Sequence, residues 1–97
     1  MPFAKELVLK EGSQFKPVCT TVQGSSPIEF IWSKDNEKVA PDPNIEISTI
    51  ENTLSTLSIK KIAIRHAGSY TCMVRNVHGQ DRSTVVLKVK CENILLS

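Results

Sequence analysis

Three cysteines and two histidines are the side chains of this sequence best suited to covalent or metal chemistry: Cys19, Cys72, Cys91, His66 and His78. A cysteine can act as a nucleophile, bind zinc or pair with a second cysteine. The histidines show no metal-ligand spacing with each other or with Cys91. No ordered motif places a serine, a histidine and an aspartate for catalysis. We therefore expect no catalytic site, no metal site and no cofactor, and a protein that is not an enzyme.

The residues around two of the cysteines favour a disulfide. Tyr70 precedes Cys72 by two positions, so its phenol and the sulfur lie on the same side of a β-strand. With Cys19 and Trp32 earlier in the chain, this order is typical of an immunoglobulin-like sandwich. In that fold the tyrosine hydroxyl turns back to the upstream backbone and the tryptophan packs on the disulfide between the sheets. Connectivity cannot be read from sequence alone, but this pattern predicts a Cys19–Cys72 bridge. Cys91 is left for an intermolecular disulfide or a partner outside this sequence, unless it is an artefact of excision.

The length of 97 residues fits one domain of this kind. Residues 19 and 72 are 53 positions apart, and closing a loop of that length is worth roughly 4 kcal/mol in the chain-entropy account. Such a bridge requires an oxidising compartment, so we expect an extracellular domain. No signal peptide opens the chain, which indicates an excised piece of a larger protein.

The charge pattern argues against two classes of partner. The net charge is +2, and basic and acidic residues are interspersed along the chain. We therefore expect no nucleic-acid surface and no direct membrane contact. The longest apolar runs are only three or four residues, far too short to cross a membrane.

Alternating apolar residues and turn signals predict an all-β, Greek-key sandwich. The expected strands cover 3–9, 14–22, 28–34, 45–50, 54–60, 69–76 and 81–89. Pro17 should interrupt pairing locally, because proline donates no hydrogen bond to a neighbouring strand. Leu57, Trp32 and Tyr70 are expected in the core. We assign 1–90 to a single domain and 91–97 to a tail, a linker or a remnant of excision.

The sequence also resembles the intermediate (I-set) class of immunoglobulin domains over about residues 3–90. The resemblance rests on Leu57, Ile59, Ile62, Gly68, Tyr70, Cys72, Arg75, Asn76 and Gly79. One position departs from this class, because most I-set domains carry aspartate where this chain has His66. That aspartate can pair with a basic residue of a neighbouring strand, so the departure puts this ion pair in doubt here.

The run from Arg65 to Cys72 is similar to domains of the Dscam (Down syndrome cell adhesion molecule) family of arthropods, including the shortened chelicerate forms. This resemblance implies a membrane-anchored cell-surface receptor that recognises identical copies of itself. It also implies antiparallel pairing about a two-fold axis, often through the outer face of the first sheet. We expect a homodimer of this kind.

Strand alternation predicts which side chains lie on that outer face. Glu46 and Lys60 have opposite signs and are suited to meet across a two-fold axis, while small residues between them allow two sheets to approach. The alternative is an ordinary solvated face, because polar residues alternate along any exposed antiparallel sheet. The interface candidates are Lys16, Val18, Glu46, Ser48, Thr56, Ser58 and Lys60, with Thr20 and Val22 on the same side.

Other interpretations remain open. Ile31 and Met73 are expected to form a small apolar patch on the opposite sheet, which is the rival binding face. The domain could serve as a spacer in a modular muscle or matrix protein, or bind a different ligand as a heterophilic receptor. No Asn-x-Ser/Thr sequon is present to place a glycan on either face.

Overall fold

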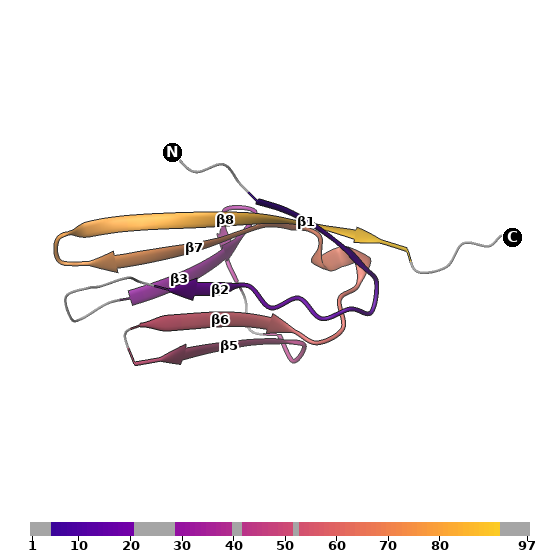
Figure 1. Cartoon of the computed structure of the whole chain (residues 1–97), viewed down its shortest axis with the longest axis horizontal. Helices are drawn as coiled ribbons and strands as arrows, with labels where there is room; N and C mark the ends of the chain where they lie inside the picture. Colours follow the sequence, from indigo (N-terminus) through magenta and orange to yellow (C-terminus); the bar gives the residue numbers. More distant parts are fainter. Residues whose placement is uncertain (1–4, 21–28, 40–41, 52, 92–97) are drawn as a thin grey trace, which may run out of the picture.

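The computed structural model describes residues 5–20, 29–39, 42–51 and 53–91. Two β-sheets pack face to face, as Figure 1 shows. Along the chain the elements are β1 (Lys5–Lys10), β2 (Val18–Thr20), β3 (Glu29–Lys34), β4 (Glu37–Lys38), β5 (Ile45–Ile50), β6 (Leu54–Ile59), a 3-10 turn η1 (Ile64–His66), β7 (Gly68–Asn76) and β8 (Gly79–Lys90). The expected all-β immunoglobulin sandwich is confirmed.

The larger sheet has the strand order β1-β8-β7-β3-β4. Its pairs are antiparallel except at one edge, where β1 runs parallel to β8 and Lys5 lies opposite Val85. The smaller sheet has the order β2-β6-β5 and is antiparallel throughout. The β1 edge was expected from sequence, whereas its parallel partner was not.

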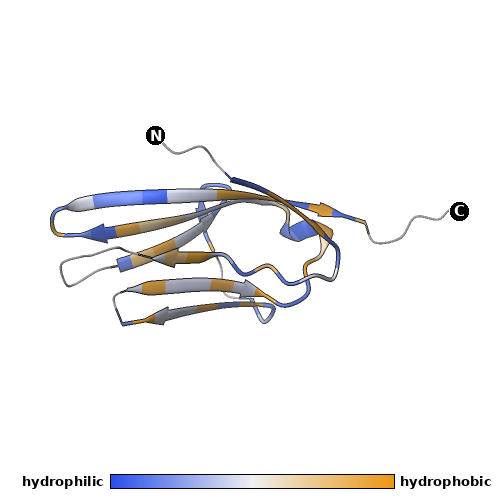
Figure 2. Ribbon diagram, viewed as in Figure 1, coloured by the Kyte–Doolittle hydropathy of each residue, from blue (hydrophilic) through white to orange (hydrophobic). Residues whose placement is uncertain are grey.

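Alternate side chains along the strands point inward and form the core between the two sheets. In β6, Ser55, Leu57 and Ile59 are buried, while the residues between them are half-buried. In Figure 2 more hydrophobic and more polar segments alternate along this strand, although the buried Ser55 is polar. The core cluster contains Phe15, Cys19, Trp32, Leu57, Ile59, Ile62, Tyr70, Cys72 and Leu87. Burial of Trp32, Leu57 and Tyr70 is therefore confirmed.

The second strand differs most from its expected range of 14–22. Regular pairing begins only at Val18, and an isolated bridge joins Phe15 to Ile59 on the other side of Pro17. Because proline has no N–H, only its carbonyl takes part, accepting a hydrogen bond from Leu57 N at 3.2 Å. The interruption expected at Pro17 is confirmed. Val22 and Ile28, both assigned to strands from sequence, lie outside the described residues.

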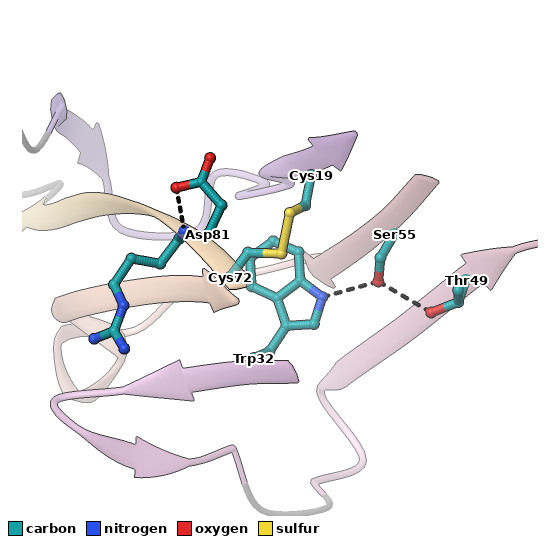
Figure 3. Close-up of a disulfide and its surroundings, with 7 residues drawn as sticks. Cys19, Trp32, Thr49, Ser55, Cys72 and Asp81 are labelled. Atoms are coloured by element: carbon teal, nitrogen blue, oxygen red, sulfur yellow. Dashed lines mark hydrogen bonds between the residues drawn. A yellow bond between two sulfur atoms is a disulfide. The ribbon is translucent and has the colours of Figure 1, made fainter. Parts of the chain in front are cut away.

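A disulfide joins the two sheets through β2 and β7. The sulfur atoms of Cys19 and Cys72 are 2.05 Å apart, and the two Cα atoms are 6.4 Å apart. Trp32 lies beside this bridge, as Figure 3 shows. The predicted pairing and the predicted tryptophan contact are thus both present. Cys91 is a free, exposed cysteine.

Candidate recognition surface

The outer face of the β2–β6–β5 sheet brings together the side chains predicted to take part in recognition. In the strand register, Glu46 lies opposite Ser58 and Ser48 lies opposite Thr56. Val18 of β2 lies on the other side of Thr56. We call this set the recognition face, and it comprises Lys16, Val18, Glu46, Ser48, Thr56, Ser58 and Lys60.

Small residues hollow the middle of the recognition face. Ser48, Thr56 and Ser58 line a shallow depression of about 480 Å³, and longer side chains, including those of Glu46 and Lys60, surround them. A second sheet or an extended segment can approach the backbone more closely here than over a row of long side chains. The hollow is therefore suited to contact rather than to enclosing a small molecule.

The charges on this face have no intramolecular partner within the part of the chain that the structure describes. Lys16, Glu46 and Lys60 are all exposed, and none belongs to an ion pair among the described residues. Exposed charges keep their water shells, so leaving them unpaired costs the fold little. Both signs remain available to a partner.

Two apolar residues that the sequence analysis did not include complete this face. Ile50 lies opposite Leu54 at the far end of the β5–β6 hairpin, and both line the hollow. Ile50 and Val18 are each 56% exposed. The alternation that places Glu46 and Ser48 outward extends to Ile50, so the sequence contained this signal. The recognition face is charged at one end and apolar at the other.

The two residues of the rival patch on the larger sheet are less exposed than expected. Ile31 and Met73 lie opposite each other on β3 and β7, as predicted. Both are half-buried rather than exposed. An ion pair between Arg75 and Glu29 lies at the neighbouring position of the same strands. Ile31 and Met73 are therefore less exposed than Val18 and Ile50 of the smaller sheet.

The tyrosine corner is present, and the side chain of His66, at the position where most I-set domains carry aspartate, accepts a hydrogen bond beside it. The Tyr70 hydroxyl donates a hydrogen bond of 2.6 Å to the backbone carbonyl of His66, and burial raises the pKa of Tyr70 to about 12. The N–H of Ala63 donates to Nδ1 of His66 at 2.8 Å, at the start of η1. The imidazole thus caps the turn as a side-chain acceptor. His66 is 3% exposed, so its role here is structural.

A polar bridge inside the sandwich was not anticipated from sequence. Nε1 of Trp32 donates to Oγ of Ser55 at 2.9 Å, and that hydroxyl lies 3.0 Å from Oγ1 of Thr49 (Figure 3). Trp32 belongs to the larger sheet and the other two to the smaller one. Alternation predicts that Ser55 points inward, but nothing local identifies its partner.

Neither a metal-ligand cluster nor a membrane-spanning helix occurs among the described residues. No group of three histidine, cysteine or acidic residues could hold a metal ion within 5–20, 29–39, 42–51 and 53–91. Among these same residues, no helix is long and apolar enough to cross a membrane.

Comparisons with known proteins agree with this architecture. Residues 2–89 match the profile of the immunoglobulin I-set domain. The chain is 32% identical over 92% of its length to cell adhesion molecule Dscam2 of Drosophila melanogaster, and 29% identical over 92% to myopalladin of Mus musculus. These matches cover only 4% and 7% of the two relatives. The I-band fragment I67–I69 from titin superposes with a TM-score of 0.79 at 34% identity, covering 89% of this chain and 30% of that one.

The family follows from both the geometry and the comparisons. The inter-sheet disulfide, the tryptophan beside it and the tyrosine corner are all in place. The profile match covers nearly the whole chain, and the chain is related to the Dscam cell-adhesion proteins. Domains of this fold commonly serve in structure or recognition. This chain belongs to the immunoglobulin I-set family.

Proposed function

We propose that this domain is part of an extracellular cell-adhesion receptor and mediates recognition between identical copies through the recognition face. The observation that carries the proposal is that Glu46 shares one hollowed face with Lys16 and Lys60, and that none of the three forms an ion pair with a described residue. A two-fold interface requires one surface to complement itself, so it must carry both signs. The relationship to the cell adhesion molecule Dscam2 supports this reading.

The positions of Glu46, Lys60 and Lys16 on the strands determine which of them can pair in each orientation of the dimer. A two-fold axis that lies between the faces and crosses the strands at the level of Ile45 and Ile59 sets β5 over β5 and β6 over β6 of the other copy, antiparallel. Glu46 then lies one strand, about 4.8 Å sideways, from Lys60 of the other copy, within reach of a lysine side chain. An axis along β6 instead exchanges β5 with β2 and sets Glu46 over Lys16. We propose the antiparallel arrangement, with Glu46 pairing with Lys60.

Charge reversal tests this arrangement by sedimentation equilibrium in a Cys91→Ser background, which removes disulfide-linked dimers. Glu46→Lys and Lys60→Glu should each weaken self-association roughly tenfold, because each replaces two attractive pairs by two repulsive ones. An equimolar mixture of the two variants should recover a heterodimer. The double variant should also recover its own homodimer.

The control is Lys38→Glu, which makes the same charge change on β4 of the other sheet and should leave association unchanged. If Lys16→Glu weakens the dimer and Lys60→Glu does not, the parallel arrangement is correct and the antiparallel one is wrong. A dimer indifferent to all of these changes would move the contact away from the recognition face. A protein that stays monomeric at every concentration would refute homophilic recognition by this domain alone.

A spacer role in a modular array is the second candidate. It is favoured by the likeness to the titin I-band fragment and to myopalladin, which matches that to Dscam2 in extent. A strictly monomeric domain that gains stability only when joined to its neighbours would support the spacer role. Reversible self-association sensitive to Glu46 would count against it.

A further inference from the structure

One end of the sandwich gathers four lysines from three separate segments. Lys10 ends β1 and Lys90 ends β8, and the two lie opposite each other in the parallel register. Lys60 and Lys61 follow β6. Figure 1 shows the ends of β1, β6 and β8 at the same side of the molecule. We call Lys10, Lys60, Lys61 and Lys90 the basic end.

Backbone hydrogen bonds hold these segments together. Glu11 N donates to the carbonyl of Lys90, and Gly12 N donates to the carbonyl of Ile62, both at 2.8 Å. Ile62 N donates in return to Ser13 at 2.9 Å. The turn after β1 is thus tied to the ends of β8 and β6 at once. The lysines are exposed side chains on a fixed backbone, not members of a flexible tail.

The charge at this end is not neutralised by the described part of the molecule. None of the four lysines forms an ion pair with a described residue, whereas nearby Lys88 pairs with Glu6 and Arg65 with Asp42. Glu11 is the single acidic residue in the connecting turn. Glu46 lies near Lys60 and Lys61, with which it lines a shallow depression. Four lysines against these two carboxylates leave an excess of positive charge at the basic end.

This arrangement costs stability, which points to a use outside the fold. Like charges placed directly opposite on neighbouring strands repel, and Lys10 faces Lys90 in this way. Glutamine at either position would keep the strand and remove the repulsion. A polyanion bound across the basic end would attract all four lysines and so offset the repulsion between them.

The chemistry of the surroundings selects the kind of polyanion. The aromatic residues Phe15, Trp32 and Tyr70 are buried and Phe30 packs against the core, so none of them offers a platform for stacking bases. The disulfide is of the kind formed in oxidising compartments, where the abundant polyanions are sulfated polysaccharides. We propose that the basic end binds a sulfated glycosaminoglycan chain. This proposal shares the extracellular placement of the proposed function, but it does not depend on self-association.

The test compares binding of the domain to heparin across a series of salt concentrations. Lys10→Gln/Lys61→Gln/Lys90→Gln removes three charges from the basic end and avoids Lys60, which also belongs to the recognition face. This variant should bind at least roughly tenfold more weakly at physiological salt, and its affinity should fall less steeply as salt rises, because fewer counterions are exchanged. Its thermal unfolding midpoint should be equal or higher, since the Lys10–Lys90 repulsion is gone.

The matched control removes three charges elsewhere: Lys5→Gln/Lys38→Gln/Arg82→Gln. It should keep the wild-type affinity, and heparin stripped of its sulfates should bind neither protein. Equal weakening in the control would show attraction by net charge alone and overturn the proposal. It would also be overturned by wild-type protein that fails to bind heparin, or that binds anionic phospholipid vesicles instead. Self-association of the triple variant should equal that of the wild type. Loss of heparin binding could then be told apart from loss of the dimer.

Discussion

His66 shows how one residue can replace another by keeping only part of its chemistry. A carboxylate at this position supplies acceptor oxygens and a negative charge, whereas the imidazole supplies one lone pair to Ala63 N–H. Nε2 is buried and has no hydrogen-bond partner among the described residues. The corner needs the neutral form, because Nδ1 cannot accept a hydrogen bond once it is protonated. The ion pair beside the corner is made by Arg65 and Asp42 instead, at 3.6 Å.

This requirement makes stability depend on pH. Burial lowers the pKa of His66 below its ordinary value of 6.5, and the nearby cations Arg65 and Lys34 lower it further, against an opposing effect of Asp42. The folded protein therefore binds fewer protons here than the unfolded chain. The contribution of His66 to the free energy of unfolding is complete above pH 6.5 and is lost as the pH falls toward its lowered pKa. Urea unfolding should give a smaller free energy at about pH 5.5 than at about pH 7.5.

His66→Asp is the control for this effect. The carboxylate can still accept from Ala63 N–H and stays ionised across that interval, with an ordinary pKa near 3.9. The change in stability between the two pH values should largely disappear. A variant that keeps the full pH dependence would show that the titrating group is not His66.

At the scale of elements, the two sheets are joined by a polar contact as well as by the disulfide. The indole N–H of Trp32 is buried and depends on Ser55 for its acceptor. Ser55→Ala should lower the free energy of unfolding by about 1–3 kcal/mol, because the donor then remains unsatisfied in the core. Urea unfolding monitored by tryptophan fluorescence measures this directly.

Ser58→Ala provides a matched comparison on the same strand. Ser58 points to the opposite face of β6 and is half-buried, so its loss should change stability by no more than about 0.5 kcal/mol. Equal effects of the two substitutions would refute the role given to the Trp32 hydrogen bond.

Most strands could be predicted because alternation and turn residues are local signals. Ile45–Ile50 was predicted with its exact bounds, and the spacing of Tyr70 and Cys72 predicted the corner. Contacts between segments far apart in the sequence carry no such signal. The parallel pairing of β1 with β8 and the Trp32–Ser55 hydrogen bond depend on how the sheets meet. The recognition face lies between these cases, since its members were predictable but its hollow and its apolar end required the strand register.

For the whole molecule, the disulfide is a cross-link between the two sheets that substitution can remove. It closes a separation of 53 residues between β2 and β7. Replacing both cysteines, Cys19→Ala/Cys72→Ala, should lower the free energy of unfolding by about 4 kcal/mol, because the unfolded chain gains the freedom of the open loop. Chemical denaturation measures the difference.

Cys91→Ala is the comparison for that experiment. This cysteine is exposed and unpaired among the described residues, so its loss should leave stability within about 0.5 kcal/mol of the parent. A double variant as stable as the parent would mean that the packed sheets alone account for the fold.

The parallel edge has a mechanical consequence. β1 lies next to the beginning of the chain and β8 runs toward its end, and the two strands point the same way. A force that stretches the domain through its two termini drags these strands in opposite directions along their length. Their hydrogen bonds are then loaded together in shear, rather than opened one after another from an end. The edge formed by the first and last strands is therefore arranged to carry tension in shear.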